Sequence, residues 1–83
     1  MRLSVLVERV PEGWTRAMYN GRTYGLARTT RAGGRIITIS ARELGGADLI
    51  SANVYRTVTA DHLRACEIPT SKVLAFLRAW TPA

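Results

Sequence analysis

Two residues of this chain could act as a nucleophile and its base: Cys66 and His62, the only cysteine and the only histidine. Thiol catalysis needs a thiolate beside a base that a third group orients, in an electropositive and partly exposed setting. Asp61 and Glu67 adjoin the pair, but adjacency in sequence does not make either of them that third group. A thiol enzyme using Cys66, or a small nuclease using His62, is therefore the least favoured hypothesis, and we expect a non-enzymatic protein.

Metal and cofactor chemistry has less support in the sequence. A structural zinc site needs four ligands and a catalytic one three, whereas Cys66 and His62 supply two and the carboxylates are scattered. The glycine pairs at 33–34 and 45–46 are not followed by the Lys-Ser/Thr of a phosphate-binding loop, and no GxGxxG fingerprint is present. We expect no metal site and no cofactor.

The distribution of charge is more informative. The formal net charge is +6, from 12 Lys and Arg against six Asp and Glu. Residues 1–13 and 43–83 are each balanced, so the excess lies in residues 14–42, which hold no acid and six arginines: Arg16, Arg22, Arg28, Arg31, Arg35 and Arg42. Such a segment attracts polyanions, and guanidinium groups suit phosphate and carboxylate. A GC-rich genome would also favour arginine over lysine.

Turn residues define the elements that must position these arginines. Three pairs divide the middle of the chain: Asn20-Gly21, Gly33-Gly34 and Gly45-Gly46. Tight hairpin turns need positive φ, which Gly supplies freely and Asn tolerates. The turns predict antiparallel strands over 14–19, 22–31, 35–44 and 47–57. They also set the registers: Ala17 faces Tyr24 and Thr15 faces Leu26; Arg28 faces Ile39 and Leu26 faces Ala41; Ala41, Ile39 and Ile37 face Ile50, Ala52 and Val54.

The three registers agree on one apolar sheet face, because side chains alternate along a strand. That face collects Ala17, Tyr19, Tyr24, Leu26, Ile37, Ile39, Ala41, Ile50, Ala52 and Val54. The opposite face is more polar and carries Arg16, Arg31 and Arg42 together with Trp14, Met18, Ile36 and Tyr55.

An apolar sheet face needs a cover, and the C-terminal segment offers one. Val73, Phe76, Leu77 and Trp80 have helical spacing, which predicts a helix over 69–80. At the other end, Leu3, Val5 and Val7 alternate with Arg2, Ser4 and Leu6, which predicts a strand over 2–9. Residues 62–68 indicate a further short strand, with a helical turn over 61–66 as the alternative.

These elements predict one small α+β domain spanning residues 1–83. It is an antiparallel β-meander of four to five strands with one C-terminal helix packed on one face. A lone cysteine excludes an internal disulfide, and no apolar run approaches the roughly 20 residues needed to span a bilayer. We expect a soluble, cytoplasmic protein without a membrane partner.

The polar face is the candidate site. Sheet surfaces bind single strands by stacking bases on aromatic rings while cations follow the phosphates. We therefore expect this face to dock on a polyanion, most simply nucleic acid. The candidate residues are Arg16, Arg31, Arg42, Arg22, Arg35, Trp14 and Tyr55. Arg22, Arg28 and Arg35 fall on or beside the apolar face, so Arg28 must lie at an edge, pair with an acid such as Glu67, or extend its head group to water.

Two alternatives stay open. The same basic surface could serve an adaptor or inhibitor that binds an acidic patch of a partner protein, for example in a nucleoprotein complex. An exposed sheet edge could add strand pairing to that contact or form a homodimer. In a purely structural reading, the N-terminal strand or the segment 57–68 covers Trp14 and Ile36, and the arginines form a solvated face.

Overall fold

The turn residues adopt the backbone conformations that their types favour. In the computed structural model, which describes residues 2–83, Asn20 and Gly21 have φ of 52° and 73°, as a two-residue hairpin turn requires. Gly33 and Gly34 have positive φ in the short 3₁₀ turn η1 (Ala32–Gly34), and Gly45 in the third turn. The turns connect the strands β1 (Gly13–Tyr19), β2 (Arg22–Arg31), β3 (Ile36–Glu43) and β4 (Leu49–Arg56).

The registers of the three hairpins are confirmed. Ala17 lies opposite Tyr24, Leu26 opposite Ala41, and Ile39 opposite Ala52, among the other predicted pairs. A slip of one residue would have moved the apolar side chains of a strand to the other face. The turns therefore place both sheet faces as the sequence predicts.

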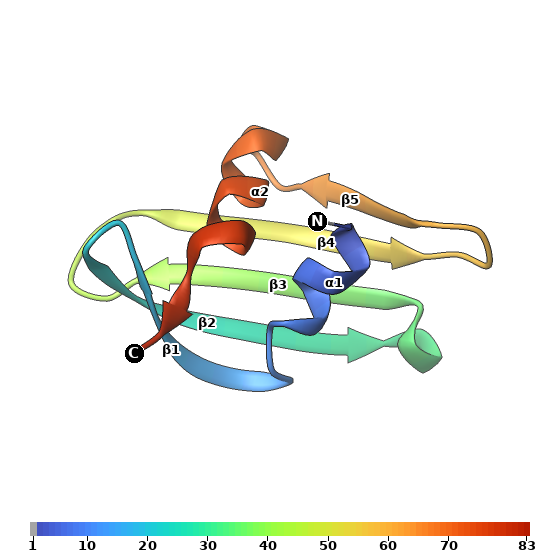
Figure 1. The fold of residues 1–83 in the computed structure, drawn as a ribbon, viewed down its shortest axis with the longest axis horizontal. Helices are drawn as coiled ribbons and strands as arrows, with labels where there is room; N and C mark the ends of the chain where they lie inside the picture. The colour runs from blue at the N-terminus through green and yellow to red at the C-terminus, as the bar shows by residue number, and fades with distance from the viewer. Residues whose placement is uncertain (1) are drawn as a thin grey trace.

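The sheet has six antiparallel strands in the order β5-β4-β3-β2-β1-β6, and Figure 1 labels β1 to β5. The prediction of four to five strands is thus corrected. The segment predicted over 62–68 forms β5 (Asp61–Ala65) at one edge, paired with β4. At the other edge, β6 (Thr81–Pro82) follows the C-terminal helix and pairs with β1.

The strand predicted over 2–9 is wrong, because this segment forms the helix α1 (Leu3–Glu8). Leu6, Val7 and Val10 are buried, while Val5 is 47% exposed. Together with the partly buried Leu3, the buried positions have the spacing i, i+3, i+4 and i+7 of a helix rather than the alternation of a strand. A short segment carries both patterns, and packing against the sheet selects the helical one.

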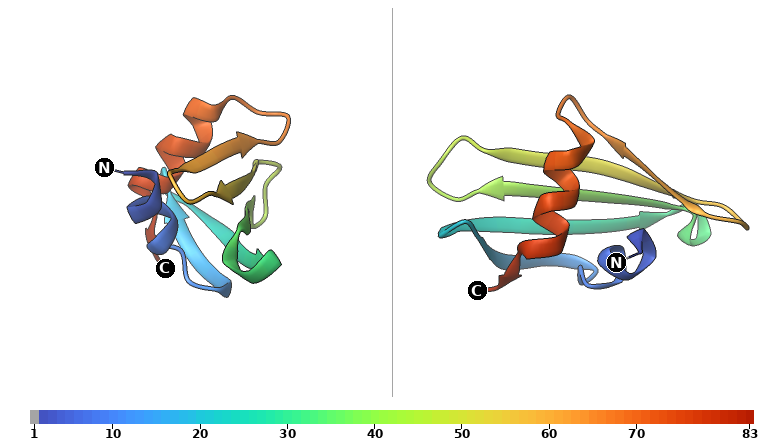
Figure 2. Two further views of the ribbon diagram at one scale, coloured as in Figure 1. Left: turned by 90° about the vertical axis from the view of Figure 1, so that its right-hand side faces the viewer. Right: turned by 45° about the horizontal axis from the view of Figure 1, so that its top comes forward.

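Both helices lie on the apolar face of the sheet, as Figures 1 and 2 show. The predicted C-terminal helix is confirmed as α2 (Thr70–Ala79), which buries Val73, Phe76 and Leu77. The core lies between helices and sheet and comprises Leu6, Val7, Val10, Ala17, Tyr24, Leu26, Ile37, Ile39, Ala41, Ile50, Ala52, Val54, Val73, Phe76, Leu77 and Trp80. Among residues 2–83, no helix has the length and apolar composition needed to cross a bilayer.

Two arginines satisfy carbonyl groups near the C-terminal ends of the helices. The Arg9 guanidinium donates to the carbonyls of Leu77, Arg78 and Trp80 at 3.0, 3.2 and 3.0 Å, at the end of α2, where carbonyls lack intrahelical partners. Arg28 donates to the carbonyls of Val7, in the last turn of α1, and of Val10, just after it, at 3.1 and 3.0 Å. These bonds join segments that are far apart in sequence.

Candidate functional site

The sheet face opposite the helices carries no element of the described chain. We call it the open face. Its residues follow from the alternation of side chains along each strand and from the register between neighbouring strands. They are Trp14, Arg16, Met18, Thr23, Gly25, Ala27, Thr29, Arg31, Ile36, Thr38, Ser40, Arg42, Leu49, Ser51, Asn53, Tyr55, His62 and Arg64. This set contains no Asp or Glu. Trp14 is 64% and Tyr55 39% exposed, so neither α1 nor β5 covers the face, and the purely structural reading of Trp14 does not hold.

Four arginines share the open face. Arg16, Arg31 and Arg42 were predicted there from register, and β5 adds Arg64 opposite Asn53. All four are exposed, and within residues 2–83 none of them is in an ion pair. Arg31 donates one hydrogen bond to Thr38 Oγ1 at 3.1 Å. Its remaining donors, and those of the other three, are available to a ligand.

Sequence reasoning missed Arg64 because it lies in the charge-balanced part of the chain. The acids that balance that part lie on the other side of the sheet or in connecting segments. The signal that would have found Arg64 was the short strand predicted over 62–68. Extending the alternation from Tyr55 across to His62 places Arg64 on the polar face.

The structure does not bring Arg22, Arg28 and Arg35 to the open face. Arg22 lies on the helix side of the sheet, 3.5 Å from Glu43. Arg28 pairs with Glu8 and Glu12 at 3.8 and 3.6 Å, and not with Glu67. Arg35 follows η1, where its Nε donates to the carbonyl of Ala32 at 3.0 Å. The acid-free segment 14–42 is therefore split between two sides of the sheet.

Five of the six acids are used in ion pairs on the helix side of the sheet: Glu8, Glu12, Glu43, Asp48 and Asp61. Glu67 is exposed in the link between β5 and α2. The hydrogen bond from Arg56 lowers the pKa of Glu8, with further lowering by the charge of Arg28. This separation of charge leaves the open face with a positive potential that acids of the same chain do not offset locally.

A second ionic group joins α2 to the sheet. Asp48 accepts hydrogen bonds from Lys72 Nζ and the Tyr24 hydroxyl, both at 2.7 Å. The bond from Lys72, followed by that from Tyr24, lowers the pKa of Asp48. Burial, with the hydrogen bond to Asp48, raises the pKa of Tyr24 to about 12. Asp48 is thus ionised at neutral pH, and its charge is balanced on the helix side.

Trp14 occupies a defined position on the open face. Arg16, Gly25 and Arg42 lie side by side on β1, β2 and β3, and the indole of Trp14 leans over the glycine. A Cβ at position 25 would lie 2.8 Å from Nε1 and 3.1 Å from Cζ2 of the indole. The missing side chain therefore makes room for the indole edge at a position whose neighbours on β1 and β3 are Arg16 and Arg42.

Tyr55 lies at one end of the β3–β4 ladder. It lies between His62 of β5 and Ile36 of β3, and Ile36 lies opposite Arg31. Toward the centre, Thr38 Oγ1 donates to Asn53 Oδ1 at 2.9 Å. The face thus carries Trp14 on β1 and Tyr55 on β4, with hydroxyl and amide groups on the strands between them.

Cys66 and His62 are not assembled as a thiol–imidazole pair. The amide of Cys66 continues the β4–β5 pairing by donating to the carbonyl of Ser51 at 2.9 Å. Four residues of extended chain separate the two Cα atoms by about 13 Å, too far for a hydrogen bond between the side chains. In the part of the chain that the structure describes, no three His, Cys, Asp or Glu residues cluster as metal ligands.

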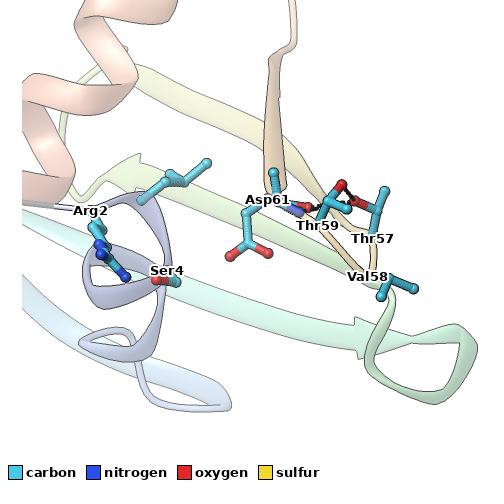
Figure 3. A pocket seen from close by; sticks show the side chains of 8 residues that line it. Arg2, Ser4, Thr57, Val58, Thr59 and Asp61 are labelled. Carbon is cyan, nitrogen blue, oxygen red and sulfur yellow. Dashed lines mark hydrogen bonds between the residues drawn. The ribbon is translucent and has the colours of Figure 1, made fainter.

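A shallow cavity of about 450 Å³ lies between α1 and the β4–β5 hairpin (Figure 3). The Thr57 hydroxyl donates to the carbonyl of Ala60 at 2.8 Å, and Asp61 lies 3.6 Å from Arg56. Two of the polar groups that line the cavity thus have partners within the chain. The lining residues are Arg2, Leu3, Ser4, Thr57, Val58, Thr59, Ala60 and Asp61.

No protein-family model, curated protein or solved structure matches this chain. The open face is the strongest candidate, because it combines exposed aromatic residues with arginines that are in no ion pair within residues 2–83.

Proposed function

We propose that this protein is a small, non-enzymatic binding module whose open face docks on nucleic acid. One observation carries the proposal: Arg16, Arg31, Arg42 and Arg64 share a face that holds no acid, while five of the six acids pair with cations on the helix side. Phosphate contacts from such groups supply the main, sequence-independent part of nucleic-acid affinity. The exposed Trp14 and Tyr55 favour nucleic acid over other polyanions, because bases offer rings to stack on.

The test is binding of a fluorescently labelled oligodeoxythymidylate across a salt series, followed by fluorescence anisotropy. If each open-face arginine neutralises one phosphate, log K against log salt has a slope of about −3, since each phosphate of a single strand contributes about −0.7. Arg64→Gln reduces the magnitude of the slope by about 0.7. Arg35→Gln, which removes the same charge away from the open face, leaves the slope unchanged. Absence of binding at low salt, or equal effects of the two variants, would contradict the proposal.

A second candidate function is docking on an acidic protein surface as an adaptor or inhibitor. The position of β5, which carries Arg64 and His62, at the edge of the sheet favours it, because an outer strand can pair with a strand of a partner. Poly-glutamate discriminates between the two candidates, since it offers carboxylates without bases. Affinity for poly-glutamate equal to that for oligodeoxythymidylate of the same charge would favour the protein partner.

A further inference from the structure

The position of Trp14 is unusual for an indole with so much exposed surface. It is 64% exposed, yet its Nε1–Cζ2 edge occupies the space above Gly25. Gly25 is itself buried, although it belongs to the open face. The ring is therefore held against the sheet while most of it stays accessible. Such preorganisation reduces the entropy lost when a planar ligand packs on the ring.

The surroundings of Trp14 match a nucleotide better than an isolated aromatic ligand. Arg16 and Arg42 flank Gly25 on the neighbouring strands, so their Cα atoms are about 10 Å apart across two strand spacings. Neither guanidinium is in an ion pair with the described acids. A base on the indole would thus have a phosphate-binding group on each side.

The shape of the face argues against a duplex. Reading the major groove requires a helix or a two-stranded ribbon that enters it, whereas α1 and α2 lie on the other side of the sheet (Figure 2). In a duplex the base faces are also stacked on each other and closed to Trp14. Single strands leave the base faces free for stacking on a sheet surface.

We infer that the open face selects unpaired nucleic acid, with one base stacked on Trp14 and the neighbouring phosphates held by Arg16 and Arg42. This inference rests on the proposed function and adds the class of ligand. The hydroxyl and amide floor of the face is partly bonded within itself, as between Thr38 and Asn53. Recognition through stacking and phosphate contacts tolerates different bases.

The experiment compares three probes that carry the same number of phosphates: oligodeoxythymidylate, an abasic oligonucleotide of the same length, and a shorter duplex whose two strands together carry that number. Binding is followed by anisotropy and by tryptophan fluorescence, where Trp80, only 3% exposed, gives a constant background. We expect oligodeoxythymidylate to quench Trp14 and to bind more tightly than the other two probes. Trp14→Leu should abolish the quenching and weaken oligodeoxythymidylate binding about 5- to 150-fold. The same variant should change the affinity for the abasic probe by less than about twofold. Trp14→Phe should keep most of the affinity for oligodeoxythymidylate, because its ring can still stack.

A matched variant tests the position of the ring without removing it. In Gly25→Ala, the new Cβ would lie 2.8 Å from the indole Nε1, so the exposed ring must move while the strand backbone keeps its conformation. We expect weaker oligodeoxythymidylate binding with nearly unchanged thermal stability. If the Trp14 and Gly25 variants lose as much affinity for the abasic probe as for oligodeoxythymidylate, or if the duplex binds more tightly than oligodeoxythymidylate, the inference is overturned. The proposed binding of a polyanion would not be affected by either result. Failure of all three probes to bind at low salt would overturn both.

Discussion

At the scale of the residue, arginines of this chain have three different environments. Arg9 and Arg28 donate to carbonyls near helix ends. Arg22, Arg56 and again Arg28 pair with acids. The four arginines of the open face have no acidic partner in the described chain. A guanidinium can do each of these because it has five donors in a rigid plane and stays charged. Residue type alone therefore does not assign an arginine to the site.

Arg9→Ala is expected to lower the free energy of unfolding by about 1–2 kcal/mol, since charge-assisted hydrogen bonds contribute about this much at a partly exposed site. The variant loses three carbonyl contacts and the packing of the guanidinium 5.6 Å from the Trp80 ring centroid. Urea unfolding measures the change. Arg16→Ala is the control: it should keep stability and lose nucleic-acid affinity, whereas Arg9→Ala should do the reverse. A stability loss in Arg16→Ala as large as that in Arg9→Ala would count against this division.

Asp48→Asn is expected to lower stability at pH 7 by about 1–2 kcal/mol, because the carboxylate accepts bonds from Tyr24 and Lys72. The pKa of Asp48 is lowered in the folded state, so the unfolded chain takes up the proton first as pH falls. The contribution is therefore present above the unfolded pKa and is lost as pH falls through the folded pKa. Urea unfolding at pH 7 and pH 3 should show the gap between variant and wild type closing at the lower pH.

Glu67→Gln is the control for the acid effect, because Glu67 is exposed and lies outside the ion pairs of the described residues. Its stability should differ little from wild type at either pH. A gap for Asp48→Asn that stays constant between pH 7 and pH 3 would show that the ionised carboxylate is not what stabilises this group.

At the scale of the element, local turn chemistry determined the meander and packing determined the N-terminal segment. The Asn20-Gly21 turn and the strand alternation predict register without reference to distant residues. Leu3 to Val10, by contrast, fits both a short strand and a short helix. Six residues of helix are too few to be stable alone, so the choice depends on the apolar sheet face that α1 covers.

A pair of alanine variants distinguishes the two readings of the N-terminus. Leu6 is 1% exposed in α1, whereas a strand burying Leu3, Val5 and Val7 would turn it outward. Leu6→Ala should cost about 2–4 kcal/mol as a buried truncation, and Val5→Ala less than about 0.5 kcal/mol as a surface change. Chemical unfolding measures both. The opposite order would support a strand over residues 2–9.

At the scale of the whole molecule, the position of charge matters more than its sum. Two double variants each remove two positive charges from a formal net charge of +6. The first is Arg16→Gln with Arg64→Gln, and the second is Arg35→Gln with Arg78→Gln. Only the first pair lies on the open face. We expect the first double variant to weaken oligodeoxythymidylate binding at least tenfold at low salt and the second to remain within about twofold of wild type. Equal losses in anisotropy titrations would mean that net charge, and not the open face, attracts the ligand.

Much of the candidate site could be predicted from the sequence, and the errors in that prediction have one source. Trp14, Tyr55, Arg16, Arg31 and Arg42 were placed on one face by hairpin registers, which are local. The count of charge along the chain, however, assigns Arg22 and Arg35 to the candidate site and misses Arg64. Charge blocks in sequence do not follow the two sides of a sheet, because neighbouring residues in a strand face opposite ways.

The sequence by itself determined the turns, the registers, the two sheet faces and the C-terminal helix, since each depends on residues close together in the chain. Tertiary structure alone decided which arginines are neutralised, because their partners are distant: Arg56 reaches Glu8, and Arg9 reaches the carbonyl of Trp80. It also decided that α1 is a helix on the covered side and that Trp14 lies over Gly25. These outcomes depend on packing between segments, which no local pattern specifies.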